Sequence, residues 1–235
     1  MKHLRLICTL GVICIVASVL FIAVTPSRVA AAQLYLNKER LGPNQTSIVI
    51  IPIMTASAYS KGGFYDYYEG RCGTECLTVK INQGLDLHGH ASGHTKLALE
   101  ILDYGFINDY ILDYMLQSDP HYLDQYDKVI VLHSEYVTQA VFDALQHHKK
   151  VIYLAPNALH AKVTVNKGVM TLVQGHSYNN KYNGFDWPYD NTAQEYENTC
   201  KDWKFVPLPN GYQLNCNGEE SIYRNFDLLK ELRNL

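Results

Sequence analysis

Four consecutive polar side chains, His133-Ser134-Glu135-Tyr136, follow a run of valine, isoleucine and leucine near the middle of the 235-residue chain. An imidazole, a hydroxyl, a carboxylate and a phenol provide a proton acceptor and a metal ligand within one short segment. A carboxylate beside a buried strand must be solvated, hydrogen-bonded or metal-bound, because an unpaired buried charge is strongly unfavourable. The segment indicates either a functional site, with His133 and Glu135 as catalytic residues, or a helix start capped by Ser134 or Thr138.

The elements expected to position these side chains are buried strands alternating with helices. Near-continuous apolar, β-branched runs predict strands at Ser47–Met54, Asp127–Leu132 and Val151–Ala155. Apolar residues at helical spacing predict helices over about 94–104 and 137–148. Strands and helices that alternate over short connections are typical of an α/β fold with a mostly parallel sheet.

The last third of the chain changes character and predicts two C-terminal β-hairpins and a final helix. Turn residues lie between pairs of alternating segments, which is the pattern of a hairpin. The expected hairpins are Ala161–Val165 with Val169–Val173, and Trp203–Leu208 with Tyr212–Cys216, and the helix spans about 221–232. Without a repeat or a long linker, residues 47–235 are expected to form a single extracellular α/β domain.

Polar segments follow each of the expected parallel strands, where ligands of open parallel sheets bind. A tyrosine- and glycine-rich loop, residues 59–68, also follows the first strand. We expect this loop and the segment at 133–136 to open onto the same crevice. The candidate binding-pocket residues are Tyr59, Tyr65, Tyr67, Tyr136 and Asn157.

Two of these stretches carry a resemblance to a known family. Val-Leu-His-Ser-Glu-Tyr-Val-Thr at 131–138 and Phe-Tyr-Asp-Tyr-Tyr at 64–68 resemble the C-terminal domain of the N,N-dimethylformamidase large subunit and its exported archaeal relatives. The resemblance covers roughly residues 47–175. It implies a class I glutamine amidotransferase-like fold, in which a doubly wound sheet forms three layers with its helices.

In the amidase, the same resemblance implies a mononuclear iron held by tyrosines and a glutamate, with an activated water that attacks a formamide. The glutamate corresponds to Glu135, which is the expected metal ligand here. The tyrosine ligands would come from the group Tyr59, Tyr65, Tyr67 and Tyr68. Val137 replaces a tryptophan that often follows Glu-Tyr in the family, and the amidase's N-terminal domain and small subunit have no counterpart in this chain.

The first 32 residues are expected to direct the chain to the membrane. Lys2 and Arg5 precede an uncharged apolar run, Leu6–Val24, which as a helix is just long enough to span a hydrocarbon core of about 30 Å. A cleaved signal peptide is the alternative, because Ala30–Ala32 supplies small residues for cleavage. Residues 33–46 are expected to be a tether, so the protein would be single-pass with an extracellular domain, or secreted.

The cysteines after the apolar run agree with an exported protein. An even number of cysteines in an exported chain predicts disulfides, and four cysteines allow three connectivities. The simplest pairing is Cys72–Cys76 and Cys200–Cys216. The alternative is a zinc site that would bring all four thiolates together.

Charge and missing motifs exclude several functions. All acidic residues lie after residue 32, so the expected domain is acidic and a poor partner for nucleic acid. Ser134 lacks the Gly-x-Ser-x-Gly elbow of serine hydrolases, and no cysteine follows a strand where an amidotransferase needs its nucleophile. No Walker or Gly-x-Gly-x-x-Gly pattern supports nucleotide binding.

Two further segments have a functional and an ordinary interpretation. His88, His90 and His94 could bind a divalent metal, or they could form a solvated glycine-rich loop. The polar and aromatic loop 175–189 could line a pocket, bind glycans or pack as a surface loop.

Two functions from different classes fit these observations. The first is a non-catalytic extracellular domain, tethered to the membrane or secreted, that binds a small molecule or an envelope ligand. The alternative is an iron- or other metal-dependent hydrolase of small amide C–N bonds. In that case Glu135 and loop tyrosines would hold the metal and His133 would assist proton transfer.

Overall fold

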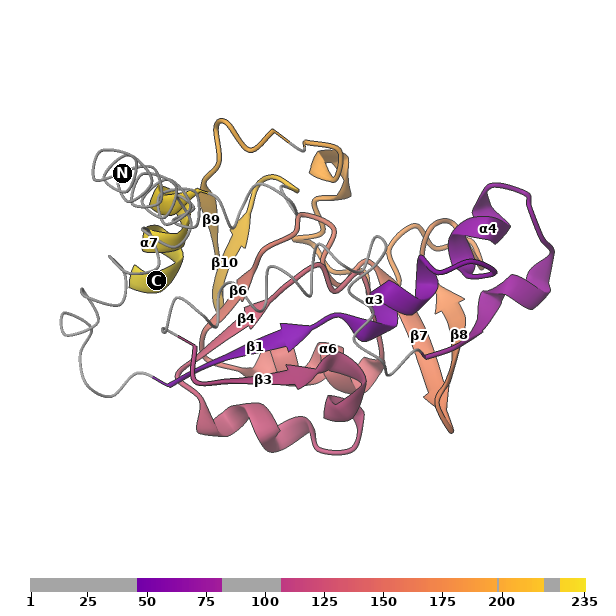
Figure 1. The fold of residues 1–235 in the computed structure, drawn as a ribbon, viewed down its shortest axis with the longest axis horizontal. Helices are drawn as coiled ribbons and strands as arrows, with labels where there is room; N and C mark the ends of the chain where they lie inside the picture. Colours follow the sequence, from indigo (N-terminus) through magenta and orange to yellow (C-terminus); the bar gives the residue numbers. More distant parts are fainter. Residues whose placement is uncertain (1–45, 82–106, 198, 218–224) are drawn as a thin grey trace, which may run out of the picture.

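The computed structural model describes residues 46–81, 107–197, 199–217 and 225–235, which form a mixed α/β fold with two sheets (Figure 1). The larger sheet has six strands in the order β3-β1-β4-β6-β10-β9, and only β9 runs antiparallel to its neighbour. Its strands are β1 (Ser47–Ile51), β3 (Asp109–Leu112), β4 (Lys128–Val131), β6 (Val151–Tyr153), β9 (Phe205–Leu208) and β10 (Gly211–Leu214).

The three strands expected from apolar runs are all present as the central strands β1, β4 and β6. Each is buried along its whole length, which explains why the sequence shows continuous rather than alternating hydrophobicity. The first strand was expected to reach Met54 but ends at Ile51. Pro52 offers no backbone N–H, and the helix α3 (Ile53–Ala58) begins directly after it.

A second sheet has the order β2-β8-β7-β5 and consists of β2 (Thr78–Lys80), β5 (Tyr136–Val137), β7 (Ala161–Asn166) and β8 (Val169–Gln174). The hairpin β7–β8 is confirmed, although it belongs to this sheet and not to the larger one. The second expected hairpin, β9–β10, is also confirmed and extends the larger sheet beside β6.

The interpretation of residues 133–136 as a helix start is wrong in its bounds. Tyr136 and Val137 pair with β7 as strand β5, and the helix α6 (Gln139–His147) begins after them. Thr138 is the cap, because its hydroxyl accepts a hydrogen bond from the Val141 amide. The polar segment therefore connects β4 in one sheet to β5 in the other.

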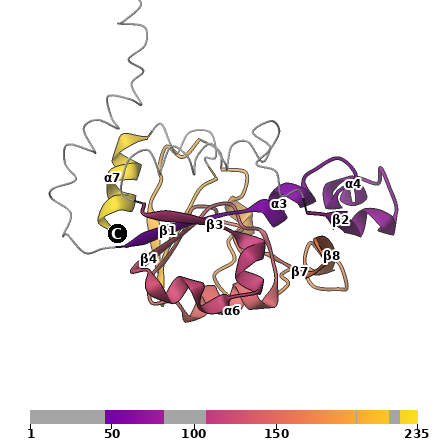
Figure 2. The ribbon, with the colours of Figure 1, turned by 60° about the horizontal axis from the view of Figure 1, so that its bottom comes forward.

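Helices lie on both sides of the larger sheet. In Figure 2, α6 lies below β1 and β4, whereas α7 (Phe226–Asn234) lies above them. Both views place α4 (Phe64–Tyr68) close to the hairpin β7–β8, beyond the end of β1 that leads into α3 (Figure 1, Figure 2). Short 3-10 helices complete the described elements: η2 (Thr74–Leu77), η3 (Asp113–Gln117), η4 (Pro120–Gln125) and η5 (Thr192–Gln194).

Both expected disulfides, Cys72–Cys76 and Cys200–Cys216, are present, so the zinc alternative for these cysteines is wrong. Two disulfides are typical of extracellular or secreted proteins. Within the described ranges, no helix is long and apolar enough to cross a bilayer. The expected leader at 1–32, nearly all of the tether, the helix at 94–104 and the histidines His88, His90 and His94 lie outside the described residues.

Asp113 anchors the start of α3, although it lies on the neighbouring 3-10 helix. Its carboxylate is fully buried and accepts hydrogen bonds from the Met54 amide, at 3.1 and 3.2 Å, and from the Tyr114 amide, at 2.8 Å. Burial raises the pKa of Asp113 to about 8, although these backbone hydrogen bonds oppose the shift.

We predict that Asp113→Asn flattens the pH dependence of stability. The carboxyl titrates near 3.8 when unfolded and near 8 when folded, so its contribution is fully present below about pH 4 and is lost as the pH rises through 8. Over that range the unfolding free energy of the wild type should fall relative to the variant by up to about 1.4 kcal/mol per pH unit. Urea unfolding between pH 4 and 9 measures the difference, and parallel profiles would contradict the assignment.

Candidate functional site

The carboxylate of Glu135 is the centre of the candidate site. Glu135 is 0% exposed and lies between β4 and β5, where the two sheets meet. Its carbonyl accepts a hydrogen bond of 2.9 Å from the Ala161 amide, which fixes the backbone against β7. A side chain in this position has protein groups and no bulk water around it, so its partners must come from the protein or from a bound ligand.

Tyr59 reaches Glu135 from the end of α3. Its hydroxyl donates a hydrogen bond of 2.8 Å to Glu135 Oε2. The helix is held against this segment by Thr55, whose hydroxyl accepts a hydrogen bond of 3.1 Å from the Tyr136 amide. The polar segment after the first strand and the polar segment after the middle strand are therefore in direct contact.

Tyr65 reaches the same carboxylate from α4. Its hydroxyl oxygen lies 3.2 Å from Glu135 Oε1 and 2.7 Å from the Tyr59 hydroxyl oxygen, and the two rings stack with centroids 4.0 Å apart. Gly63 allows the chain to fold back this tightly, because a Cβ there would overlap the Ala58 carbonyl oxygen.

His176 completes the group from the loop after β8. Its Nε2 hydrogen-bonds to Glu135 Oε1. The imidazole lies between two tyrosine rings, with centroids 5.7 Å from Tyr136 and 4.9 Å from Tyr68. The backbone at His176 is left-handed, with φ of 49°, a conformation that non-glycine residues rarely adopt and that is common at functional sites.

His133 lies on the other side of the carboxylate. Its Nε2 is 3.7 Å from Glu135 Oε2, and its side chain is only 5% exposed. It precedes Glu135 by two residues at the end of β4, so the strand fixes its position relative to the carboxylate. An imidazole at this distance could accept or donate a proton beside the site.

The electrostatics favour an ionised carboxylate and neutral phenols. Burial alone would raise the pKa of Glu135, but the His176 hydrogen bond and charge, the charge of His133 and the Tyr59 hydrogen bond together hold it below its usual range. Burial and the neighbouring carboxylate raise the pKa of Tyr59 and of Tyr65. Phenolate forms of these tyrosines would therefore require a bound cation to compensate the charge.

A cavity of about 390 Å³ adjoins the group on the side of His176. The tyrosines Tyr67, Tyr68 and Tyr178 line it together with His176 and the polar residues Ser177, Asn179 and Asn180. His176 therefore contacts both the buried carboxylate and the cavity. Residues 176–180 of the loop at 175–189 line a pocket, which agrees with one of the three interpretations of that loop.

The structure brings together four of the residues proposed from the sequence: Glu135, Tyr59, Tyr65 and His133. The other three residues have different surroundings. Tyr67 lines the cavity, Tyr136 is fully buried against the His176 ring, and Asn157 is buried with its amide 3.4 Å from Glu195.

His176 was not proposed as a site residue. The only sequence signal was its place in a polar, aromatic loop, because nothing in the sequence places that loop beside Glu135. A second buried pair lies close to it: His160 Nδ1 is 2.8 Å from Asp190, and the His160 ring centroid is 4.5 Å from that of His176.

The oxygens of Tyr59, Tyr65 and Glu135 have a spacing that suits a metal ion. The three pairwise separations, taken at Glu135 Oε2, are 2.7, 2.8 and 3.4 Å. Metal–oxygen bonds of about 2.0 Å place neighbouring ligands of an octahedron about 2.8 Å apart. Among the described residues, no three His, Cys, Asp or Glu side chains gather as ligands, so any metal here depends on the phenols.

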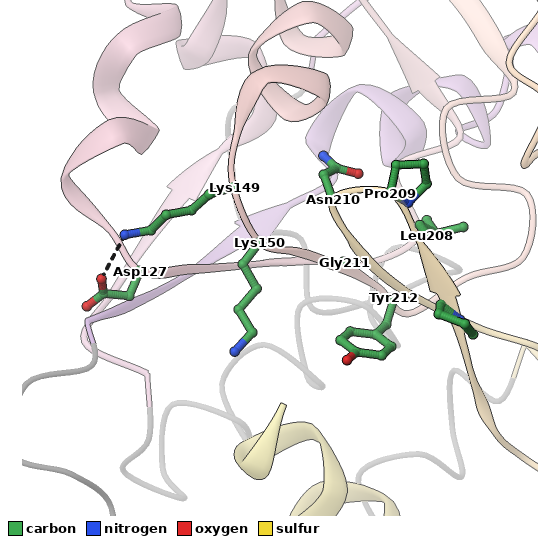
Figure 3. Close-up of a pocket in the computed structure, with 9 residues that line it drawn as sticks. Asp127, Lys149, Lys150, Leu208, Pro209, Asn210, Gly211 and Tyr212 are labelled. Carbon is green, nitrogen blue, oxygen red and sulfur yellow. Dashed lines mark hydrogen bonds and ion pairs between the residues drawn. The ribbon is translucent and has the colours of Figure 1, made fainter.

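A second hollow, of about 530 Å³, lies at the opposite end of the larger sheet. Figure 3 shows that Lys149 pairs with Asp127, at 3.0 Å, whereas the Lys150 ammonium points into the open space near Tyr212. This hollow holds none of the residues proposed from the sequence. The Glu135 group is therefore the stronger candidate.

Comparison with known proteins adds no assignment to this geometry. No protein-family model matches the chain, and no curated protein sequence matches it either.

We predict that Glu135→Gln destabilises the chelator-treated protein at neutral pH. Because the pKa of Glu135 is depressed, its contribution is present above about pH 4.5 and is lost as the pH falls through the folded-state value. Breaking a buried charge network of this kind costs about 3 kcal/mol. Urea unfolding at pH 7 and at pH 3.5 measures this effect, which should shrink at the lower pH.

The exposed residue Glu231 provides the matched control. Glu231→Gln should change the unfolding free energy by less than about 0.5 kcal/mol at both pH values. A loss for Glu135→Gln that is equal at pH 7 and pH 3.5 would show that the charge of Glu135 contributes nothing.

Proposed function

We propose that this protein is a metal-dependent hydrolase of small amide C–N bonds. The observation that supports this function best is the convergence of three oxygen ligands, from Tyr59, Tyr65 and Glu135, with separations of 2.7, 2.8 and 3.4 Å, two of which are close to the edge of an octahedron. The resemblance to the dimethylformamidase C-terminal domain predicts the same ligand types. Of the four tyrosines considered, the geometry favours Tyr59 and Tyr65.

The donor set favours ferric iron. Phenolate and carboxylate oxygens are hard, anionic donors, and three of them balance a trivalent charge in a buried site. A metal ion held there would polarise a substrate carbonyl and lower the pKa of a water molecule. Tyr59 and Tyr65 would both lose their protons on binding, so metal affinity should rise with pH.

Other residues near the three ligands would bind the substrate and transfer protons. The cavity lined by Tyr67, Tyr68 and His176 is large enough for a small amide, and His176 connects it to the Glu135 carboxylate. In the reaction, the oxygen of water adds to the amide carbonyl carbon, the C–N bond breaks, and a carboxylate and an amine form. His133 Nε2, 3.7 Å from Glu135 Oε2, would act through this carboxylate to assist proton transfer between the water and the leaving nitrogen.

The proposal also covers the detailed fold type and the cellular location of the protein. The parallel order β3-β1-β4-β6, with α6 and α7 on opposite faces, supports a doubly wound, three-layer, amidotransferase-like arrangement. The two disulfides support an extracellular domain. We propose that residues 1–32 tether this domain to the membrane or direct its secretion.

One observation favours the non-catalytic function as a second candidate. The Glu135 carboxylate already has Tyr59, Tyr65 and His176 as hydrogen-bond partners, so both of its oxygens are hydrogen-bonded without a metal. In that case the cluster would only stabilise the fold, and the neighbouring cavity would bind a small polar or envelope ligand.

Metal content and colour separate the two candidates. We expect the full-length chain, expressed with iron and purified, to hold about one iron per molecule and to be pink or violet, because phenolate ligation to ferric iron absorbs visible light. Tyr59→Phe and Tyr65→Phe should each weaken or abolish the colour, because each removes one phenolate. Elemental analysis and the visible spectrum measure both effects.

Tyr110→Phe is the matched control, since Tyr110 is 48% exposed and lies on β3 at the edge of the larger sheet. It should keep both iron and colour. A folded wild type that remains colourless and metal-free in iron-supplied medium would exclude the hydrolase and leave the non-catalytic domain.

A further inference from the structure

We infer that His176 is a fourth protein ligand of the metal at this site, giving a set of two tyrosines, one glutamate and one histidine. The inference rests on the proposed function and extends it beyond the ligand types that the resemblance implies. It starts from the contact between His176 Nε2 and Glu135 Oε1.

The contact places an imidazole nitrogen at the same carboxylate that the two phenols share. Tyr59 hydrogen-bonds to Oε2, whereas Tyr65 and His176 both contact Oε1. A cation held by the phenol and carboxylate oxygens would therefore meet the imidazole nitrogen as its next neighbour. Imidazole binds iron readily, and Nε2 can coordinate once its proton is lost.

The His176 ring is held rigidly, as a preformed ligand should be. It stacks on the Tyr136 ring and packs against the tilted Tyr68 ring, and its side chain is only 19% exposed. Gly175 brings the loop close to β7, because a Cβ at that position would lie 2.7 Å from the Ala161 Cβ. The left-handed backbone at His176 has a cost that packing and hydrogen bonding must offset.

His133 is the other imidazole near the carboxylate, and its geometry is less suited to ligation. Its Nε2 lies 3.7 Å from Glu135 Oε2, which is longer than a hydrogen bond. His133 also lies in the same short segment as Glu135, so coordination by His133 would not connect the metal to another part of the fold. His176 instead would link the loop after β8 to residues from α3 and α4.

Four protein ligands would change what the site can do. If the ion were six-coordinate, the fourth protein ligand would reduce the positions left for water and substrate from three to two. Because His176 also lines the cavity, metal binding would fix the cavity wall at 175–180.

Pulsed electron paramagnetic resonance tests the inference directly. Ferric iron is added to the chelator-treated full-length chain, and nitrogen modulation from a coordinated imidazole is recorded. We expect modulation in the wild type and in His133→Gln, and its loss in His176→Gln, with iron affinity at least about tenfold weaker, since even outer-shell partners contribute this much. His121→Gln, at an 88% exposed side chain, is the control and should match the wild type.

Hydrogen exchange provides a second readout on the same samples. Amides at 175–180 should become more protected when iron binds to the wild type, and should not respond in His176→Gln. Wild-type protein that binds iron without nitrogen modulation would overturn the inference and leave the proposed function intact. Modulation that survives in His176→Gln but is lost in His133→Gln would also overturn it. A wild type that binds no iron would overturn both.

Discussion

The rest of this structure depends on one constraint: the Glu135 carboxylate must stay ionised although it is buried away from water. Glu135 is fully buried, and an ionised carboxylate in that position is tolerated only if it is hydrogen-bonded, paired with a cation or bound to a metal. Its partners come from α3, from α4 and from the loop after β8. The site and the packing of the two sheets are therefore parts of the same arrangement.

Small backbone features bring those partners into place. Asp113 holds the first turn of α3, Thr55 ties that helix to β5, and Gly63 lets α4 fold back toward Tyr59. The left-handed backbone at His176 directs the imidazole of this residue toward the Glu135 carboxylate. Left-handed non-glycine residues are unfavourable by themselves, so they persist only where surrounding contacts determine the backbone.

The sequence predicted the central strands and the hairpins because continuous apolar runs and turn residues are local signals. It also predicted that the segment at 133–136 and the loop near residue 60 would meet, since carboxyl ends of parallel strands share one edge. It could not select Tyr59 and Tyr65 among the tyrosines or find His176. Those positions depend on how Gly63 folds α4 back and on where the hairpin β7–β8 packs, and both are long-range properties.

A crystal of the iron-loaded full-length protein, measured at the iron absorption edge, tests the central claim most directly. The account predicts one anomalous peak within bonding distance of the Tyr59 and Tyr65 hydroxyl oxygens and the Glu135 carboxylate. A peak elsewhere, or these three oxygens still hydrogen-bonded to one another in crystals with excess iron, would contradict it.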